Sequence, residues 1–404
     1  MIRFILTKYL VLCFAVLCIT SMVTAQTSLP LNSNWIRAIV WSPDGTQIAF
    51  GTQGGIIQIL DGSTGQRLLT LQNDATSPIY TLNWSPDGLK LASGGFDRLV
   101  KIWDTHTGGL IQTFAGHAAS VGDLDWHPDG IHLASAAEYE NPIVWDTTTG
   151  VGSRVSAGDA FTVQWSPDGN ILAVGGQYGQ IRLYPIGHYN YENARIIEGL
   201  PGIAWRMAWD ESGTNLAVGI TYTPESSMVQ VWNVATNQLI YNFEENTSNM
   251  YSIKWSPDNN FLVTASVDQT VRIWDMATGL PIEVIQTQDP AFSVDFSPFG
   301  GRLAFGAVSS ETAGLQQDAI PVIESFADGA IQIVVPAPSL ERLQAIQAAC
   351  MTAPALATMD AQEITVDALP DYVAQIEALT DAEIPPGCAA DLVAVAEALI
   401  AEGQ

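Results

Sequence analysis

The chain has 404 residues, a length that corresponds on average to two or three domains. Its 42 acidic and 15 basic residues leave a net charge of −27, although 47% of the residues are hydrophobic. So apolar a chain folds around a core, which excludes a disordered acidic protein. The acidic balance also argues against binding to nucleic acid, because phosphate recognition needs a basic surface.

The first 25 residues have the layout of a secretory signal peptide. Arg3 and Lys8 form a basic start, an apolar run spans 9–20, and small residues at 23–25 provide a cleavage site. An uncleaved anchor is the alternative, but the apolar run is shorter than the roughly 20 residues that a spanning helix needs. We therefore expect cleavage, a secreted or periplasmic protein, and no integral membrane span in the mature chain.

Residues 26–336 contain an internal repeat. The motif Trp-Ser-Pro-Asp-Gly recurs in strict or looser copies at intervals of 39 to 46 residues, which makes seven units. The copies begin at Trp41, Trp84, Trp126, Trp165, Trp209, Trp255 and Phe296. Proline and aspartate favour a turn and glycine accepts a positive φ, so each motif is expected to join two strands.

Each unit predicts four short strands, which in the second unit cover 79–84, 90–94, 99–103 and 110–114. A four-stranded sheet of this size cannot bury both of its faces alone. Seven such sheets set radially can pack face to face and leave only short edges exposed.

The unit resembles the WD repeat of β-propeller proteins. Its third strand ends in Trp-Asp at Trp103, Trp145 and Trp274, and Gly116-His117 matches the Gly-His that opens a family unit. The resemblance implies an all-β, seven-bladed WD-type β-propeller with a small C-terminal α-helical appendage. A Tol-associated propeller type also carries Ser-Pro-Asp-Gly turns, but the Trp-Asp strand ends favour the WD type.

The resemblance also implies a buried hydrogen-bond set that joins a strand Ser or Thr, a loop Asp and the third-strand Trp to a His. The matching residues are Ser93, Asp97 and Trp103 in the second unit and Thr264, Asp268 and Trp274 in the sixth. Neither unit has the His, whereas His117 could serve Ser135 and Trp145 in the third unit.

The seventh unit allows two interpretations. Residues 318–330 can supply the third strand, with 331–335 as the outer strand. Alternatively 331–335 is the third strand, and residues 27–31 supply the outer strand that closes the ring.

Residues 337–404 form an acidic, alanine-rich segment with 11 acidic residues and one basic residue. Apolar residues at helical spacing predict helices from about 339 to 350, from 371 to 379, and from about 385 to 403. Cys350 and Cys388 would pin two of these helices through a disulfide, unless both are buried free thiols. The segment is either a small cap packed on the propeller or a docking module for a partner, and its charge would favour a basic one.

The chain carries no recognisable catalytic or metal-binding motif. Its five histidines show no helical i,i+4 pair, no cysteine pair has ligand spacing, and phosphate-cradling loops and nucleophile elbows are absent. Five aspartates belong to the repeated turns and are expected to be structural. We therefore predict no catalytic residues, no metal and no cofactor, while a hydrolase or lyase assembled from propeller loops stays open.

Aromatic residues gather at one position of the repeat. Four places before the turn aromatic the units carry Arg37, Tyr80, Gly122, Phe161, Trp205, Tyr251 and Phe292. The resemblance implies that this position rings the mouth of the central channel, where WD propellers commonly bind peptides. Neighbouring loop positions add Trp35, Phe96 and Asp159. The alternative is that the column continues the core, because residues two apart in a strand share a face.

Together these features predict a scaffold that captures a peptide or protein partner at an aromatic-lined channel mouth. Arg37 and Asp159 would supply polarity beside the rings. An extracytoplasmic hydrolase or lyase and a sugar-binding envelope component are the alternatives.

Overall fold

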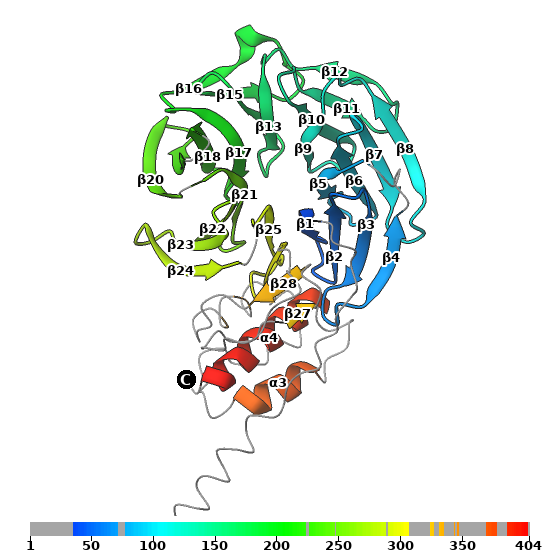
Figure 1. Cartoon of the computed structure of the whole chain (residues 1–404), viewed down its shortest axis with the longest axis vertical. Coiled ribbons are helices and arrows are strands. Elements are labelled where there is room, and N and C mark those ends of the chain that lie inside the picture. Colours follow the sequence, from blue (N-terminus) through cyan, green and yellow to red (C-terminus); the bar gives the residue numbers. More distant parts are fainter. Residues whose placement is uncertain are drawn as a thin grey trace, which may run out of the picture.

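The computed structural model describes residues 35–71, 77–223, 226–246, 248–287, 290–306, 324–326, 331–334, 343, 346, 369–377 and 386–402. Its strands form seven four-stranded antiparallel sheets, set radially around a central axis. This arrangement is a β-propeller with C-terminal helices at one side (Figure 1).

Six of the sheets follow chain order from the innermost to the outermost strand. Sheet one contains β1 (Ile36–Trp41), β2 (Gln47–Thr52), β3 (Ile57–Asp61) and β4 (Arg67–Leu71). Sheet two contains β5 (Ile79–Trp84), β6 (Lys90–Gly95), β7 (Leu99–Asp104) and β8 (Leu110–Ala115). Sheet three contains β9 (Val121–Trp126), β10 (His132–Ala137), β11 (Ile143–Asp146) and β12 (Gly152–Arg154). Sheet four contains β13 (Ala160–Trp165), β14 (Ile171–Gly176), β15 (Gln180–Pro185) and β16 (Arg195–Glu198), with the short 3₁₀ helix η1 (Tyr191–Asn193) before β16. Sheet five contains β17 (Ile203–Trp209), β18 (Asn215–Thr223), β19 (Ser226–Asn233) and β20 (Gln238–Asn246). Sheet six contains β21 (Met250–Trp255), β22 (Phe261–Ser266), β23 (Thr270–Asp275) and β24 (Leu280–Gln286). The strands predicted for the second unit are confirmed to within one residue.

Sheet seven has a different strand order. It contains β25 (Ser293–Phe296), β26 (Leu303–Gly306), β27 (Glu324–Phe326) and β28 (Ile331–Val334), and β28 lies between β26 and β27. Residues 331–334 are therefore the third strand, which contradicts the first interpretation of this unit. The outer strand is β27, which the second interpretation placed at residues 27–31. Those residues lie outside the described part of the chain.

The repeated turn is held by its own side chains. In sheet two the hydroxyl of Ser85 donates to Oδ1 of Asp87 at 2.6 Å and accepts the backbone N–H of Lys90 at 2.9 Å. Gly88 closes the turn with a φ of 70°, a left-handed conformation that favours glycine. The turn tryptophan then joins two sheets, because Nε1 of Trp84 donates to the carbonyl of Val40 at 3.2 Å.

The predicted hydrogen-bond set is present where the resemblance placed its hydroxyls. Nε1 of Trp103 donates to Ser93 at 2.9 Å, and Nε1 of Trp274 donates to Thr264 at 3.3 Å. In sheet three the hydroxyl of Ser135 contacts Nε1 of Trp145 at 2.8 Å and Nε2 of His117 at 2.7 Å, as predicted.

The loop aspartates of the other two units use different partners. Asp97 forms an ion pair with Lys101 at 2.6 Å, and Asp268 forms one with Arg272 at 2.8 Å. Each basic partner lies in the third strand of its sheet, so each ion pair ties that strand to the loop that precedes it.

Two described helices follow the propeller, α3 (Leu369–Glu377) and α4 (Pro386–Glu402). Their bounds lie within two residues of the predicted ones. Leu369, Tyr372, Leu392 and Val395 share a buried cluster, and Phe299 of sheet seven packs against it. Cys388 is fully buried and disulfide-bonded. The predicted partner Cys350 lies outside the described residues, so that pairing stays a prediction.

Helix α4 docks on the seam between sheets seven and one (Figure 1). Asp391 is fully buried, accepts the hydroxyl of Ser297 at 2.7 Å, and pairs with Nε of Arg302 at 2.7 Å. Arg302 also donates to the carbonyls of Gly62 and Gly45 in sheet one. The helix is therefore part of the propeller's own packing.

Candidate binding site

The aromatic column lies at a break in strand regularity. In the first strands of six sheets, the register of pairing with the second strand skips the residue four places before the turn aromatic. The skipped residues are Arg37, Tyr80, Gly122, Phe161, Trp205 and Tyr251. A bulge of this kind inserts one residue and re-aims its side chain. The alternation of side chains between the two faces of the strand, which would make the column part of the core, is therefore interrupted at the column.

Six aromatic rings form a continuous arc that includes four members of this column. Neighbouring ring centroids lie 4.8 to 6.1 Å apart, in stacked and edge-to-face arrangements. The order along the arc is Trp35, Phe292, Tyr251, Trp205, Phe161 and Tyr139. Residues more than 250 positions apart in the sequence therefore build one surface.

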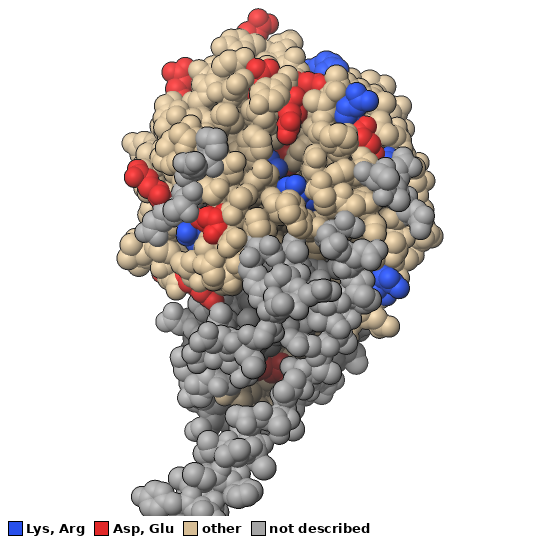
Figure 2. Space-filling model, viewed as in Figure 1, with Lys and Arg blue, Asp and Glu red and all other residues tan. Residues whose placement is uncertain are grey.

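A cavity of about 330 Å³ opens beside this arc. It contains seven of the nine residues that the sequence predicted for a binding face, which are Arg37, Tyr80, Phe96, Phe161, Trp205, Tyr251 and Phe292. Its size lies within the usual range for ligand pockets. On the face shown in Figure 2, basic side chains lie in the central depression.

The rings differ in how far they are buried. Phe161 and Phe292 are only 3% and 7% exposed and pack as core residues do. Trp205 and Tyr251 are half-buried, so each offers part of its ring to the cavity. Nε1 of Trp205 is buried and has no hydrogen-bond partner in the described structure. Because this nitrogen is buried, it is the ring surface of Trp205 that is open to the cavity.

Two arginines bring positive charge to the cavity. The Arg37 guanidinium lies 4.1 Å from the ring centroid of Phe292 and donates to Gln53 at 2.7 Å. Burial lowers the pKa of Arg37, and the nearby hydroxyl of Tyr251 opposes that shift. Arg206 donates to the backbone carbonyls of Tyr251 at 3.0 Å and of Trp205 at 2.8 Å, which holds its planar head against the aromatic arc.

Two predicted residues lie beside the cavity and not in its lining. Trp35 stacks on Phe292 at 5.6 Å and is 42% exposed, so it extends the aromatic surface outward. Asp159 accepts the hydroxyl of Tyr178 at 3.1 Å. The structure lines the cavity instead with Glu138 and Arg206, both of which sequence reasoning missed. Arg206 directly follows the bulge residue Trp205. Comparing the units at the next position of the repeat could therefore have identified it.

Carboxylates on the innermost strands serve the backbone of the neighbouring sheet. The innermost strands have a free edge toward the axis, and its N–H groups need acceptors. Oδ2 of Asp125 accepts the N–H of Trp165 at 2.7 Å, and Oδ2 of Asp295 accepts that of Trp41 at 2.8 Å. Burial raises the pKa of Asp295 and raises that of Asp125 to about 7. These groups have the pKa shifts typical of catalytic acids, yet each one connects two neighbouring sheets.

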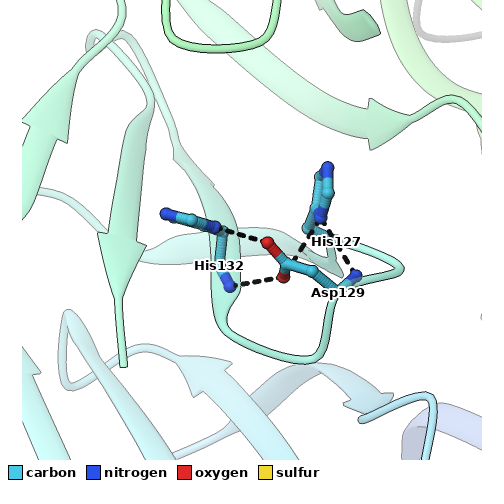
Figure 3. Close-up of side chains that lie close together, drawn as sticks. All are labelled: His127, Asp129 and His132. Carbon is cyan, nitrogen blue, oxygen red and sulfur yellow. Dashed lines mark hydrogen bonds and ion pairs between the residues drawn. The ribbon is translucent and has the colours of Figure 1, made fainter. Parts of the chain in front are cut away.

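A second cluster lies on the turn between β9 and β10. His127, Asp129 and His132 place their ring nitrogens and carboxylate oxygens within 4.8 Å of one another (Figure 3). Sequence reasoning missed this group because it searched for helical and Cys-type spacing. Comparison of the repeat units could have indicated this cluster, since the third unit has His127 where most other units have serine.

Comparison with known proteins places four segments of the chain in the WD domain, G-beta repeat family: residues 65–104, 108–146, 154–184 and 237–275. The chain is 28% identical over 151 residues to Protein SPA1-RELATED 4 of Arabidopsis thaliana, a match to 35% of this chain and 18% of that protein. It is 25% identical over 158 residues to Protein groucho of Drosophila melanogaster, covering 37% and 20%. It is 23% identical over 179 residues to the anaphase-promoting complex subunit cdc20 of Dictyostelium discoideum, covering 34% and 36%. The chain thus spans only about a fifth to a third of the length of these relatives.

The relatives contradict the predicted extracytoplasmic location. They are mostly intracellular proteins of eukaryotes, among them a subunit of the anaphase-promoting complex. The prediction depended on residues 1–25, whose basic start and apolar run are a compositional signal only, and these residues lie outside the described structure. None of the helices that the structure describes is long and apolar enough to cross a membrane.

The matched segments coincide with strands of sheets one to six, and their Trp-Asp strand ends carry the buried hydroxyl contacts described above. The chain therefore contains WD40 repeats, and they are built into a β-propeller.

Proposed function

We propose that this chain is a seven-bladed protein-interaction scaffold that binds an extended peptide segment of a partner at the mouth of its channel. The observation that carries this proposal is that seven predicted residues from different sheets line one cavity of about 330 Å³. One relative's name, the anaphase-promoting complex subunit, describes a member of a protein assembly. That name agrees with a scaffold role.

The chemistry of the mouth favours a peptide with apolar or aromatic side chains and accessible oxygen atoms. The half-buried rings of Tyr80, Trp205 and Tyr251 offer flat apolar surface. Arg37 and Arg206 line the cavity and carry N–H donors. Peptide carbonyls or an acidic side chain would satisfy these donors, which differs from the basic partner expected from the acidic C-terminal segment.

The proposal predicts that removing the half-buried rings weakens peptide binding. Random peptides displayed on phage would be selected on the full chain, and the affinity of enriched peptides measured by fluorescence anisotropy. The double variant Trp205→Ala/Tyr251→Ala should lower that affinity at least tenfold, because central aromatic residues contribute about 2 kcal/mol or more each to such interfaces.

Leu280→Ala is the matched control, because Leu280 is a large apolar residue that is 63% exposed on β24. Its affinity should equal that of the unmodified chain. If enriched peptides bound the double variant and the unmodified chain equally well, the mouth would not be the binding face. Thermal unfolding of each variant shows whether the propeller itself is intact.

A further inference from the structure

The third unit departs from the other units at two positions of its turn. Most copies begin the turn with a serine, whereas the third unit has His127. Five residues later the third unit has His132, a position occupied by Gln47, Lys90, Ile171 or Phe261 in comparable copies. Both histidines flank the repeat aspartate Asp129, so one turn has gained two imidazoles beside a carboxylate.

The two imidazoles flank the carboxylate of Asp129, and the possible ligand atoms of the three side chains lie within 4.8 Å of one another (Figure 3). Nδ1 of His132 lies 2.7 Å from Oδ2 of Asp129, and Nδ1 of His127 lies 3.0 Å from Oδ1 of the same carboxylate. The side chain of His127 is 9% exposed, while those of Asp129 and His132 are 31% and 37% exposed. The cluster is therefore anchored on its buried side and reachable from solvent on the other.

The contacts of His127 determine which of its nitrogens carries the hydrogen. Its Nε2 lies 2.9 Å from the carbonyl oxygen of Gly169 in the next sheet, and a carbonyl can only accept, so Nε2 carries the hydrogen. In the neutral ring, Nδ1 then has a lone pair that lies 3.0 Å from a carboxylate oxygen. Two acceptors at that distance need a shared hydrogen-bond donor or a cation between them. An imidazole whose outer N–H is fixed by a backbone carbonyl is also the usual arrangement of a metal-bound histidine.

The backbone N–H of Asp129 reaches the same Nδ1 at 3.0 Å. This contact does not commit the nitrogen, because in the turns at Asp44, Asp87 and Asp168 the corresponding N–H contacts its own carboxylate. The same alternative acceptor exists at Asp129. A cation can therefore take the lone pair of His127 without leaving a backbone donor unpaired.

We propose that Nδ1 of His127, the carboxylate of Asp129 and Nδ1 of His132 bind one divalent transition-metal ion of the zinc class. Two imidazole nitrogens and a carboxylate oxygen are a donor set that suits zinc, and three protein ligands leave a position for water on the exposed side. Through the Gly169 contact, the ion would also fix the turn of sheet three against that of sheet four.

The test uses the full chain after treatment with a chelator, titrated with zinc in competition with a chromophoric chelator. We expect one zinc ion per chain. His127→Ser should weaken binding at least tenfold, and it should fold because serine is the residue that most other units carry there. His132→Gln should weaken binding to a similar degree, and its side chain is exposed enough for the turn to tolerate the change. His106→Gln, which alters an exposed histidine on a turn of sheet two, should bind zinc as the unmodified chain does.

Cobalt provides a second readout, because ligation by these groups gives visible absorption bands that both cluster variants should lose. The proposal is overturned if the full chain binds no zinc, or if His127→Ser and His132→Gln bind it as tightly as the unmodified chain.

Discussion

At the scale of single residues, Asp125 links two neighbouring sheets at an electrostatic cost. Its carboxylate joins β9 to β13 through the N–H of Trp165, yet burial raises its pKa to about 7. In the unfolded chain the same group ionises near pH 4. The folded state therefore holds this proton more tightly, and the free energy of unfolding falls as the pH rises from about 4 to about 7.

Asp125→Asn should remove this pH dependence. The amide oxygen can still accept the N–H of Trp165, and it carries no charge to bury. We expect the variant to be more stable than the unmodified chain by about 1 kcal/mol or more at pH 8, with the difference shrinking toward pH 4. Urea unfolding at several pH values measures this difference directly.

Asp168→Asn is the control of opposite sign. Hydrogen bonds from Ser166 and Asn170 lower the pKa of Asp168, so its ionised form stabilises the fold. That variant should be less stable than the unmodified chain above about pH 4, and the difference should shrink as the pH falls below that value. If Asp125→Asn were instead destabilising at pH 8, the carboxylate would be stabilised by its surroundings and the argument from burial would be wrong.

The burial of the bulge residues is the feature at this scale that could not be predicted from the sequence. The aromatic column was visible because the repeat could be subtracted, but alternation along a strand could not decide between core and surface. The structure gives both outcomes, since Phe161 is buried while Trp205 and Tyr251 are half-buried. The bulge that re-aims these side chains depends on pairing with the second strand, which no single-strand pattern contains.

At the scale of elements, helix α4 supplies a group that the seventh repeat lacks. In the turns of sheets one, two and four, the serine hydroxyl donates at 2.6 Å to an aspartate two residues later. The seventh unit has Phe299 at that position, and Ser297 donates instead to Asp391 of α4 at 2.7 Å. The departure of this turn from the repeat was visible in the sequence, but the residue that compensates lies about 90 positions away.

Asp391→Ala should therefore destabilise the chain by about 3 kcal/mol or more, because it leaves the Arg302 guanidinium buried without its counter-charge. Chemical unfolding measures this loss. Replacing both partners by apolar residues, Arg302→Met with Asp391→Leu, should recover part of it, since the unpaired charge is then gone. Equal losses in the single and double variants would show that the ion pair is not the source of the stability.

At the scale of the whole molecule, the repeat allowed most of the ring to be predicted. Aligning seven similar units predicts the strand positions, turns and buried hydroxyl contacts, because a feature seen in one unit is expected at the same position of the others. The seventh sheet could not be resolved in this way, since its third and outer strands, β28 and β27, are reversed relative to chain order. The helices were predicted from apolar residues at helical spacing, but nothing in that pattern indicates where they dock.

The ring closes where sheets seven and one meet, and this seam joins residues from opposite ends of the propeller. Ser293 and Asp295 accept the N–H groups of Ile39 and Trp41 at 2.9 and 2.8 Å. Helix α4 covers the same seam, because Asp391 contacts sheet seven and Gly387 lies against the backbone of Asp44 in sheet one. Closure thus depends on side chains and on a helix in addition to strand packing.

Removing residues 386–404 should accordingly lower the thermal stability of the entire propeller by about 5 to 10 °C, on the scale of 2–4 °C per kcal/mol for domains of this size. A matched point variant is Gly387→Ala, whose added Cβ would lie 1.9 Å from the carbonyl oxygen of Asp44 and so force α4 away from the seam. Circular dichroism should show one cooperative transition in each case, because the seam belongs to the ring and not to a separate unit. A truncated chain that unfolded at the temperature of the full chain would mean that α4 only rests on a ring already closed by Ser293 and Asp295.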